Sequence, residues 1–174
     1  RALRVDGVIF PGIRSAADAQ RAVEACEYPP QGIRGVGPKR AVRYGMDDVA
    51  GYMRGRPPFL KIIQMEHADV LSRLDEIARV PGVDAWMVGP SDLSASLGQL
   101  GNEGAPAVQS AIDAICAAAR RHGIPLGAFT GDNPDALARW TDRGVRLFTI
   151  GGDTGYLVSA ARRSLVQAMG AVQS

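Results

Sequence analysis

Apolar runs of strand length alternate with stretches of helical spacing along almost the whole chain. The first pair is "VDGVIFPG" followed by "SAADAQRAVEACE", where Ser15 can cap a helix that carries Ala19, Val23 and Cys26 on one side. The pattern recurs four more times, with strands predicted at 59–65, 83–89, 125–130 and 145–152 and helices at 67–80, 105–123, 133–144 and 154–169. The sequence therefore predicts five strand–helix units.

Strict alternation with nearly continuous apolar strands is typical of a parallel sheet covered by helices. A dinucleotide-binding domain would carry GxGxxG between its first strand and helix, whereas "GIRGVG" follows a helix and precedes Pro38. Polar residues instead follow several strands, as at Glu66, Asp92 and Asp153, which is typical of a (β/α)8 (TIM) barrel. We predict an α/β fold of this kind, with residues 1–174 as one domain.

Five units cannot close an eight-stranded barrel, so we expect about three further βα units ahead of this sequence. The Gly- and Pro-rich stretch 28–45 also carries aromatic and apolar residues. It is predicted to be a long ordered loop between the first two units.

Composition narrows the function classes. Twenty Lys and Arg against 18 Asp and Glu give a net charge of +2, with no basic cluster that would indicate a nucleic-acid partner. Cys26 and Cys116 lie in apolar helical patterns and are expected to be reduced core thiols. No apolar run reaches the length of a membrane span, so a cytoplasmic protein without a membrane partner is expected.

Two carboxylates stand at neighbouring predicted strand ends. Glu66 closes one strand and Asp92 follows the next, and adjacent strands lie about 4.8 Å apart. The two side chains can therefore converge on a hard divalent cation. The alternative is that Glu66 caps the helix after it and Asp92 caps the short turn that follows.

The surrounding polar residues are weaker candidates. Gln64 lies two residues before Glu66 and shares its face of the strand, directed to the barrel interior. His67 faces the other way and opens a helix, so it is expected to be a capping or surface residue rather than a catalytic base, whereas His122 fits a favourable position at a helix C-terminus. "GPSDLS" offers backbone N–H groups to an anion at the start of a short helical segment.

Several basic residues lie in the long loop 28–45. They either contact an acidic substrate or form a solvated rim, and composition does not choose between these; they are Arg34, Lys39, Arg40 and Arg43.

Three stretches match one known family: "EYPPQGIRGVGPKRA", "IIQMEHADVLSRLDEIARVPGVDAWMVGPSDLSASLGQLGN" and "TIGGD". Over essentially its whole length the chain resembles the HpcH/HpaI aldolases, metal-dependent class II pyruvate aldolases that include 4-hydroxy-2-oxoheptanedioate and 2-keto-3-deoxy-L-rhamnonate aldolases. The resemblance implies a TIM barrel of which this chain supplies strands 4–8.

The resemblance also implies roles for residues. Glu66 and Asp92 would bind Mg²⁺, Mn²⁺ or Co²⁺, and Gln64 would contact the pyruvyl group of the substrate. Ser91, with the Asp92 backbone, would hold the substrate carboxylate, and Val36 would line the aldehyde side.

The implied reaction is cleavage of a 4-hydroxy-2-oxo acid into pyruvate and an aldehyde through a metal-stabilised pyruvate enolate, in aromatic or sugar acid catabolism. No Schiff base is needed, and neither Lys39 nor Lys61 is well placed for one. The family's catalytic Arg and His lie in the first three strands, so no residue of this chain inherits those roles.

A homo-oligomer, by resemblance a hexamer that exchanges the C-terminal helix, is expected. The alternatives are an acyl-CoA lyase similar to the citrate lyase β-subunit, and a non-catalytic half-barrel that acts through oligomerisation.

Overall fold

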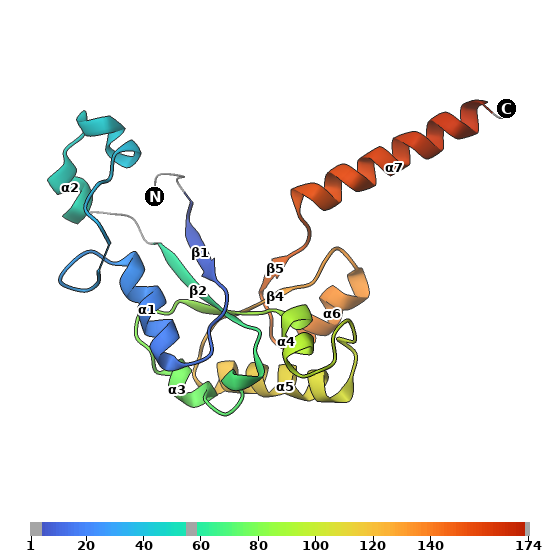
Figure 1. Cartoon of the computed structure of the whole chain (residues 1–174), viewed down its shortest axis with the longest axis horizontal. Coiled ribbons are helices and arrows are strands. Elements are labelled where there is room, and N and C mark those ends of the chain that lie inside the picture. Colours follow the sequence, from blue (N-terminus) through green and yellow to red (C-terminus); the bar gives the residue numbers. More distant parts are fainter. Residues whose placement is uncertain (1–4, 55–58, 173–174) are drawn as a thin grey trace.

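Five parallel strands form one sheet in the order of the sequence (Figure 1). In the computed structural model, which describes residues 5–54 and 59–172, each strand pairs in parallel with the next one along the chain. The strands are β1 (Gly7–Phe10), β2 (Leu60–Met65), β3 (Ala85–Val88), β4 (Leu126–Phe129) and β5 (Leu147–Thr149). The predicted βα architecture is confirmed, and the five strands form a half-barrel.

Helices follow the strands, and local sequence signals set their ends. The structure has α1 (Ala16–Cys26), η1 (Arg40–Gly45), α2 (Val49–Arg54), η2 (Ala68–Val70), α3 (Leu74–Ala78), α4 (Pro90–Ser96), α5 (Pro106–Arg121), α6 (Pro134–Asp142) and α7 (Asp153–Val172). The Ser15 hydroxyl accepts a hydrogen bond from the Asp18 N–H at 3.2 Å at the start of α1. The Asn133 side chain caps α6 in the same way, accepting from the Asp135 N–H at 2.9 Å.

The single helix predicted over 67–80 is wrong. The segment is divided into the 3₁₀ turn η2 and the five-residue α3, because Arg73 has φ −128° and ψ 11°, outside the helical region. The apolar spacing that suggested one helix still holds, since Val70, Leu74 and Ile77 are all buried.

The two faces of the sheet differ in how well they are covered. On the helix-covered face, Ile63, Trp86 and Val88 are fully buried in the main core. On the opposite face a small buried cluster joins Ile62, Ala85 and Met87, but large apolar side chains around it are 36–48% exposed, namely Ile9, Leu60, Phe129 and Leu147. The inner face of the half-barrel is therefore apolar and only partly covered by the residues that the structure describes.

The long loop after α1 is ordered, as predicted, because it is hydrogen-bonded to the end of that helix. The N–H groups of Ile33 and Arg34 donate to the carbonyls of Glu24 (3.0 Å) and Glu27 (3.3 Å). A helix leaves its last carbonyls without intrahelical partners, and the loop supplies them. Gly32 lies so close to the same two carbonyls that a Cβ there would be 2.3 and 2.4 Å from their oxygens.

The C-terminal helix α7 projects away from the rest of the molecule (Figure 1). Its large apolar side chains are mostly solvent-exposed, with Leu157 at 72%, Leu165 at 61% and Met169 at 55%. Within residues 5–54 and 59–172, no helix has both the length and the apolar character required to cross a bilayer.

Candidate functional site

Glu66 and Asp92 come together at the carboxyl ends of two neighbouring strands. Glu66 directly follows β2, and Asp92 lies in the first turn of α4, just after β3. The register pairs Gln64 with Met87 and Met65 with Val88, which brings the two strand ends side by side. Burial raises the pKa of Glu66 above its usual range; the Gly12 N–H opposes this shift, and the nearby Asp92 carboxylate adds to it.

Two donors fix the orientation of the Glu66 carboxylate. The Gly12 N–H donates to Oε1 at 2.7 Å, and the Gln64 side-chain amide donates to Oε2. Glu66 is only 9% exposed, so these bonds hold a nearly buried carboxylate in one position. Gln64 and Glu66 share the inner face of the sheet, as predicted.

Neither carboxylate is a helix cap. His67, not Glu66, caps the turn η2, because its Nδ1 accepts a hydrogen bond from the Asp69 N–H at 3.2 Å. The cap position of α4 is Gly89, and Asp92 makes no side-chain cap bond there. The capping interpretation of both carboxylates is therefore wrong, whereas the capping role predicted for His67 is confirmed.

Gly89 permits the close packing of the site, a role that the sequence did not predict. A Cβ at Gly89 would be 2.7 Å from Gln64 Nε2 and 3.0 Å from Glu66 Cβ. Gly12, also missed, has φ +72°, a conformation that favours glycine. In both cases the available signal was a Gly next to a Pro directly after a strand.

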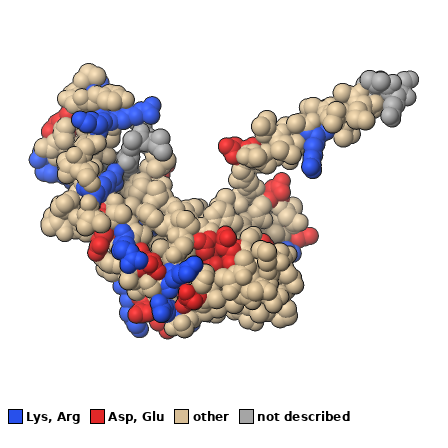
Figure 2. Space-filling model, in the orientation of Figure 1, with Lys and Arg blue, Asp and Glu red and all other residues tan. Residues whose placement is uncertain are grey.

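Two hollows open beside the carboxylate pair, and Asp92 lines both. The first, of about 270 Å³, is lined by Gln64, Gly89, Pro90, Ser91, Asp92 and Phe129. The second, of about 310 Å³, is lined by Gly12, Arg14, Glu66, His67, Asp92, Ala95 and Ser96. Figure 2 shows acidic side chains gathered on this part of the surface, around α4.

Ser91 is hydrogen-bonded to a residue that the sequence did not indicate. Its hydroxyl donates to Glu103 Oε1 at 2.5 Å. Glu103 lies in the connection between α4 and α5 and is exposed. The Ser91 hydroxyl is thus held beside the first hollow by a third carboxylate.

Three other residues considered from the sequence lie away from the pair. Val36 is 67% exposed in the loop after α1, toward the starts of the strands, and lines neither hollow. Lys61 is on the opposite face of β2 from Gln64, with Nζ 3.2 Å from Glu27 and 3.4 Å from Asp84. His122 ends α5, and its Nε2 lies 2.7 Å from Asp75. Lys61 is thus occupied as an ion-pair partner, away from the carboxylate pair.

The donor set fits a hard divalent cation. Among the described residues no group of three or more His, Cys, Asp or Glu side chains is arranged as a metal site. A cation here would therefore take two protein carboxylates and complete its coordination with water and ligand oxygens, the pattern common for Mg²⁺. Burial is the main cause of the raised pKa of Glu66, and the repulsion from Asp92 that adds to it would be relieved by a positive charge between the two groups.

The raised pKa of Glu66 predicts a pH effect on stability in the presence of EDTA. The folded state binds the Glu66 proton more tightly than the unfolded state does, so its contribution to stability is fully present below the unfolded pKa and is lost as pH rises through the folded pKa. Thermal unfolding of the wild type and of Glu66→Gln between pH 4 and pH 7 tests this. The difference in stability should shift in favour of Glu66→Gln as pH rises, and a pH-independent difference would contradict the assignment.

The chain matches the family model for HpcH/HpaI aldolase/citrate lyase over residues 2–160. It is 35% identical over 164 residues to a 2-dehydro-3,6-dideoxy-6-sulfogluconate aldolase of Pseudomonas putida, covering 94% of this chain and 64% of the relative. It is 37% identical over 157 residues to a hydroxypyruvate/pyruvate aldolase of Pseudomonas aeruginosa, covering 89% of this chain and 58% of the relative.

A crystal structure gives the same result. An HpcH/HpaI aldolase/citrate lyase family protein from Burkholderia cenocepacia J2315 superimposes with a TM-score of 0.84 at 35% identity, covering 94% of this chain and 65% of that protein. The chain thus spans about three fifths of the length of the relatives it matches. Because both its sequence and its fold match this family over most of its length, the chain belongs to the HpcH/HpaI aldolase/citrate lyase family.

Proposed function

We propose that this chain supplies the cation- and oxo-acid-binding part of a class II pyruvate aldolase. The observation that carries the proposal is the pairing of Glu66 with Asp92 at adjacent strand ends, with Gln64 bonded to Glu66 and a hollow alongside. The two relatives described above are named as aldolases, one of them acting on hydroxypyruvate and pyruvate, which supports the same reaction class.

Each residue of the site has a separate task in this proposal. Glu66 and Asp92 hold Mg²⁺, Mn²⁺ or Co²⁺, and the Gly12 N–H and the Gln64 amide keep Glu66 in position. The cation, when bound, supplies Lewis-acid polarisation of the 2-oxo group. Gln64 reaches the hollow and there contacts the pyruvyl group of the substrate.

In this proposal the substrate carboxylate binds at the start of α4. The first N–H groups of a helix have no intrahelical partners, and the Ser91 hydroxyl stands beside them. Asp92 follows in the same turn, so one ligand could contact the α4 backbone and the cation together. Phe129 forms an apolar side of the same hollow.

The proton transfers are not assigned to a residue of this chain. His67 is used as a cap, and His122 lies at the end of α5 beside Asp75. In the family pattern the catalytic Arg and His come from earlier strands, and the complete active site requires them.

The exposed apolar residues of α7 further support a homo-oligomer built through that helix. Light scattering on the purified protein tests this expectation.

Pyruvate release from a panel of 4-hydroxy-2-oxo acids tests the proposal. The protein at its full encoded length should release pyruvate in the presence of Mg²⁺, Mn²⁺ or Co²⁺ and lose this activity in EDTA. A parallel arm with 3-hydroxyacyl-CoA thioesters tests the acyl-CoA lyase alternative. Metal-independent cleavage, or cleavage of thioesters alone, would overturn the aldolase assignment.

A further inference from the structure

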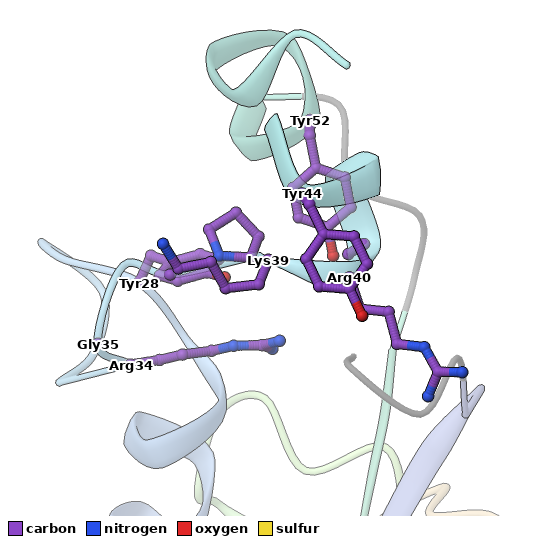
Figure 3. A pocket seen from close by; sticks show the side chains of 10 residues that line it. Tyr28, Arg34, Gly35, Lys39, Arg40, Tyr44 and Tyr52 are labelled. Atoms are coloured by element: carbon purple, nitrogen blue, oxygen red, sulfur yellow. The ribbon is translucent and has the colours of Figure 1, made fainter. Parts of the chain in front are cut away.

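We propose that a second pocket, formed by the loop after α1 together with η1 and α2, binds the carboxylate or phosphate group of a small anionic ligand. The pocket has a volume of about 410 Å³, which is within the range of small-molecule sites. It is lined by Tyr28, Arg34, Gly35, Gly37, Pro38, Lys39, Arg40, Ala41, Tyr44 and Tyr52. Figure 3 shows Tyr28 and Arg34 on one side and Tyr44, Tyr52 and Arg40 on the other.

The pocket has an excess of positive charge that no lining residue neutralises. None of the lining residues is acidic, and three are cations: Arg34, Lys39 and Arg40. The segment 28–54, which forms this lobe, contains two acidic residues, and both face other arginines. Asp47 accepts from Arg43 Nε at 2.8 Å, and Asp48 lies 4.0 Å from Arg54. Across residues 5–54 and 59–172, no ion pair joins any of the three pocket cations to a carboxylate.

The Arg34 side chain is preorganised for binding an anion. Its Nη1 donates to the Cys26 carbonyl at 3.1 Å, and its guanidinium carbon lies 4.9 Å from the ring centroid of Tyr28 and 5.9 Å from that of Phe59. These contacts fix the guanidinium plane while it extends into the pocket (Figure 3). A fixed guanidinium can offer two parallel N–H bonds to a carboxylate or a phosphate at little further cost in conformational entropy.

Tyr52 adds an unused hydrogen-bond donor. Its hydroxyl is buried and has no hydrogen-bond partner within the described part of the chain. A buried polar group without a partner destabilises the folded state. Tyr52 lines the pocket, and a small shift of the pocket wall would let a ligand oxygen supply that partner.

The backbone beside the pocket is strained at two consecutive residues, of which Tyr44 lines the pocket. Arg43 and Tyr44 have φ of +45° and +60°, in the left-handed region that side-chain-bearing residues rarely adopt. The Tyr44 N–H donates to the Lys39 carbonyl at 2.7 Å, which closes the turn and keeps Lys39 and Tyr44 at the pocket wall. Strain of this kind persists where the surrounding structure requires it and is frequent at binding sites.

The pocket is separate from the carboxylate pair. It shares no lining residue with either hollow beside Asp92. Because α1 returns antiparallel to the strands, the loop after it lies toward the start of β2, whereas Glu66 lies at the end of that strand (Figure 1). The inference therefore concerns a second ligand site, independent of the proposed aldolase chemistry.

Titration of the purified protein in EDTA with inorganic phosphate and, separately, with malonate tests the proposal. Binding followed by calorimetry and by amide NMR shifts should be saturable, and the shifts should centre on residues 34–44. Lys39→Ala and Arg40→Ala remove side chains that form no ion pair within the described part of the chain, so each should fold normally and weaken binding about tenfold. Tyr52→Phe should weaken binding roughly threefold without lowering the thermal stability of the ligand-free protein.

Arg43→Gln is the matched control, since it removes the same charge from the same lobe at a residue that does not line the pocket. It should weaken binding less than twofold at 0.15 M KCl, where long-range charge effects are screened. Stronger binding of phosphate or of malonate identifies which oxyanion the natural ligand carries. The proposal is overturned by non-saturable binding of both probes, or by equal losses in Arg43→Gln and Arg40→Ala.

Discussion

Replacing Glu66 by glutamine is expected to weaken Mn²⁺ binding by roughly 100-fold or more, since even residues that only orient metal ligands contribute 10- to 100-fold. The substitution should not disturb the fold. The amide oxygen of the new side chain can still accept from the Gly12 N–H, and the Gln64 amide can turn to accept from its NH₂ group. Calorimetric or EPR titration with Mn²⁺ measures the loss, and Asp92→Asn should behave in the same way.

Glu103→Gln provides the control for this experiment. Glu103 is an exposed carboxylate near α4 that bonds to the Ser91 hydroxyl, and it is not one of the residues that line the hollow next to Glu66. The substitution removes one negative charge from the same region without removing a proposed ligand, so Mn²⁺ affinity should change by less than about threefold. Equal losses in Glu66→Gln and Glu103→Gln would mean that Mn²⁺ responds only to general negative charge.

Gly32→Ala is expected to destabilise the protein by about 3 kcal/mol, the upper part of the usual range for overpacked sites. The added Cβ would be 2.3 Å from the Glu24 oxygen and 2.4 Å from the Glu27 oxygen. These are backbone atoms at the end of α1, so they cannot move aside as a flexible side chain would. The loop must shift instead and lose the bonds that Ile33 and Arg34 donate to the same carbonyls. Urea unfolding measures the change.

Gly35→Ala is the matched control in the same loop. A Cβ at Gly35 would have no neighbour within 4 Å, so its stability should remain within about 0.5 kcal/mol of the wild type. If both alanine variants were equally stable, the loop would not be docked on α1 as described. Gly32→Ala should also weaken anion binding in the second pocket, because Arg34 moves with the loop.

Regular alternation made most of the fold predictable. Ser15, Asn133 and Pro106 mark helix starts by local chemistry, and each acts in the structure as its residue type predicts. The break between η2 and α3 was not predictable, because the apolar spacing is the same in one helix and in two packed pieces. The backbone angles of Arg73, which make the difference, have no signature in the local sequence.

The candidate site was only partly predictable, because local sequence patterns place residues on strands but do not show where loops lie. Period-two alternation correctly placed Gln64 and Glu66 on one face, and the strand order brought Asp92 near them. The bond from the Gly12 N–H to Glu66 and the bond from Ser91 to Glu103 depend on where loops lie in space. The roles of Ser91 and Val36 in binding substrate stay predictions, and Val36 lies on the loop at the other end of the strands.

The neighbour-to-neighbour order of the sheet bears on how the chain folds. Every strand pair joins segments separated by a single connection, so each pairing closes a loop of moderate length and a modest entropic cost. Folding rates fall as contacts become more distant in sequence, and closing a barrel by pairing its first strand with its last is the most distant contact of all. Among the five described strands, the first does not pair with the last. The kinetic barrier to forming this sheet is therefore set by the pairing of neighbouring strands, which can occur one pair after another.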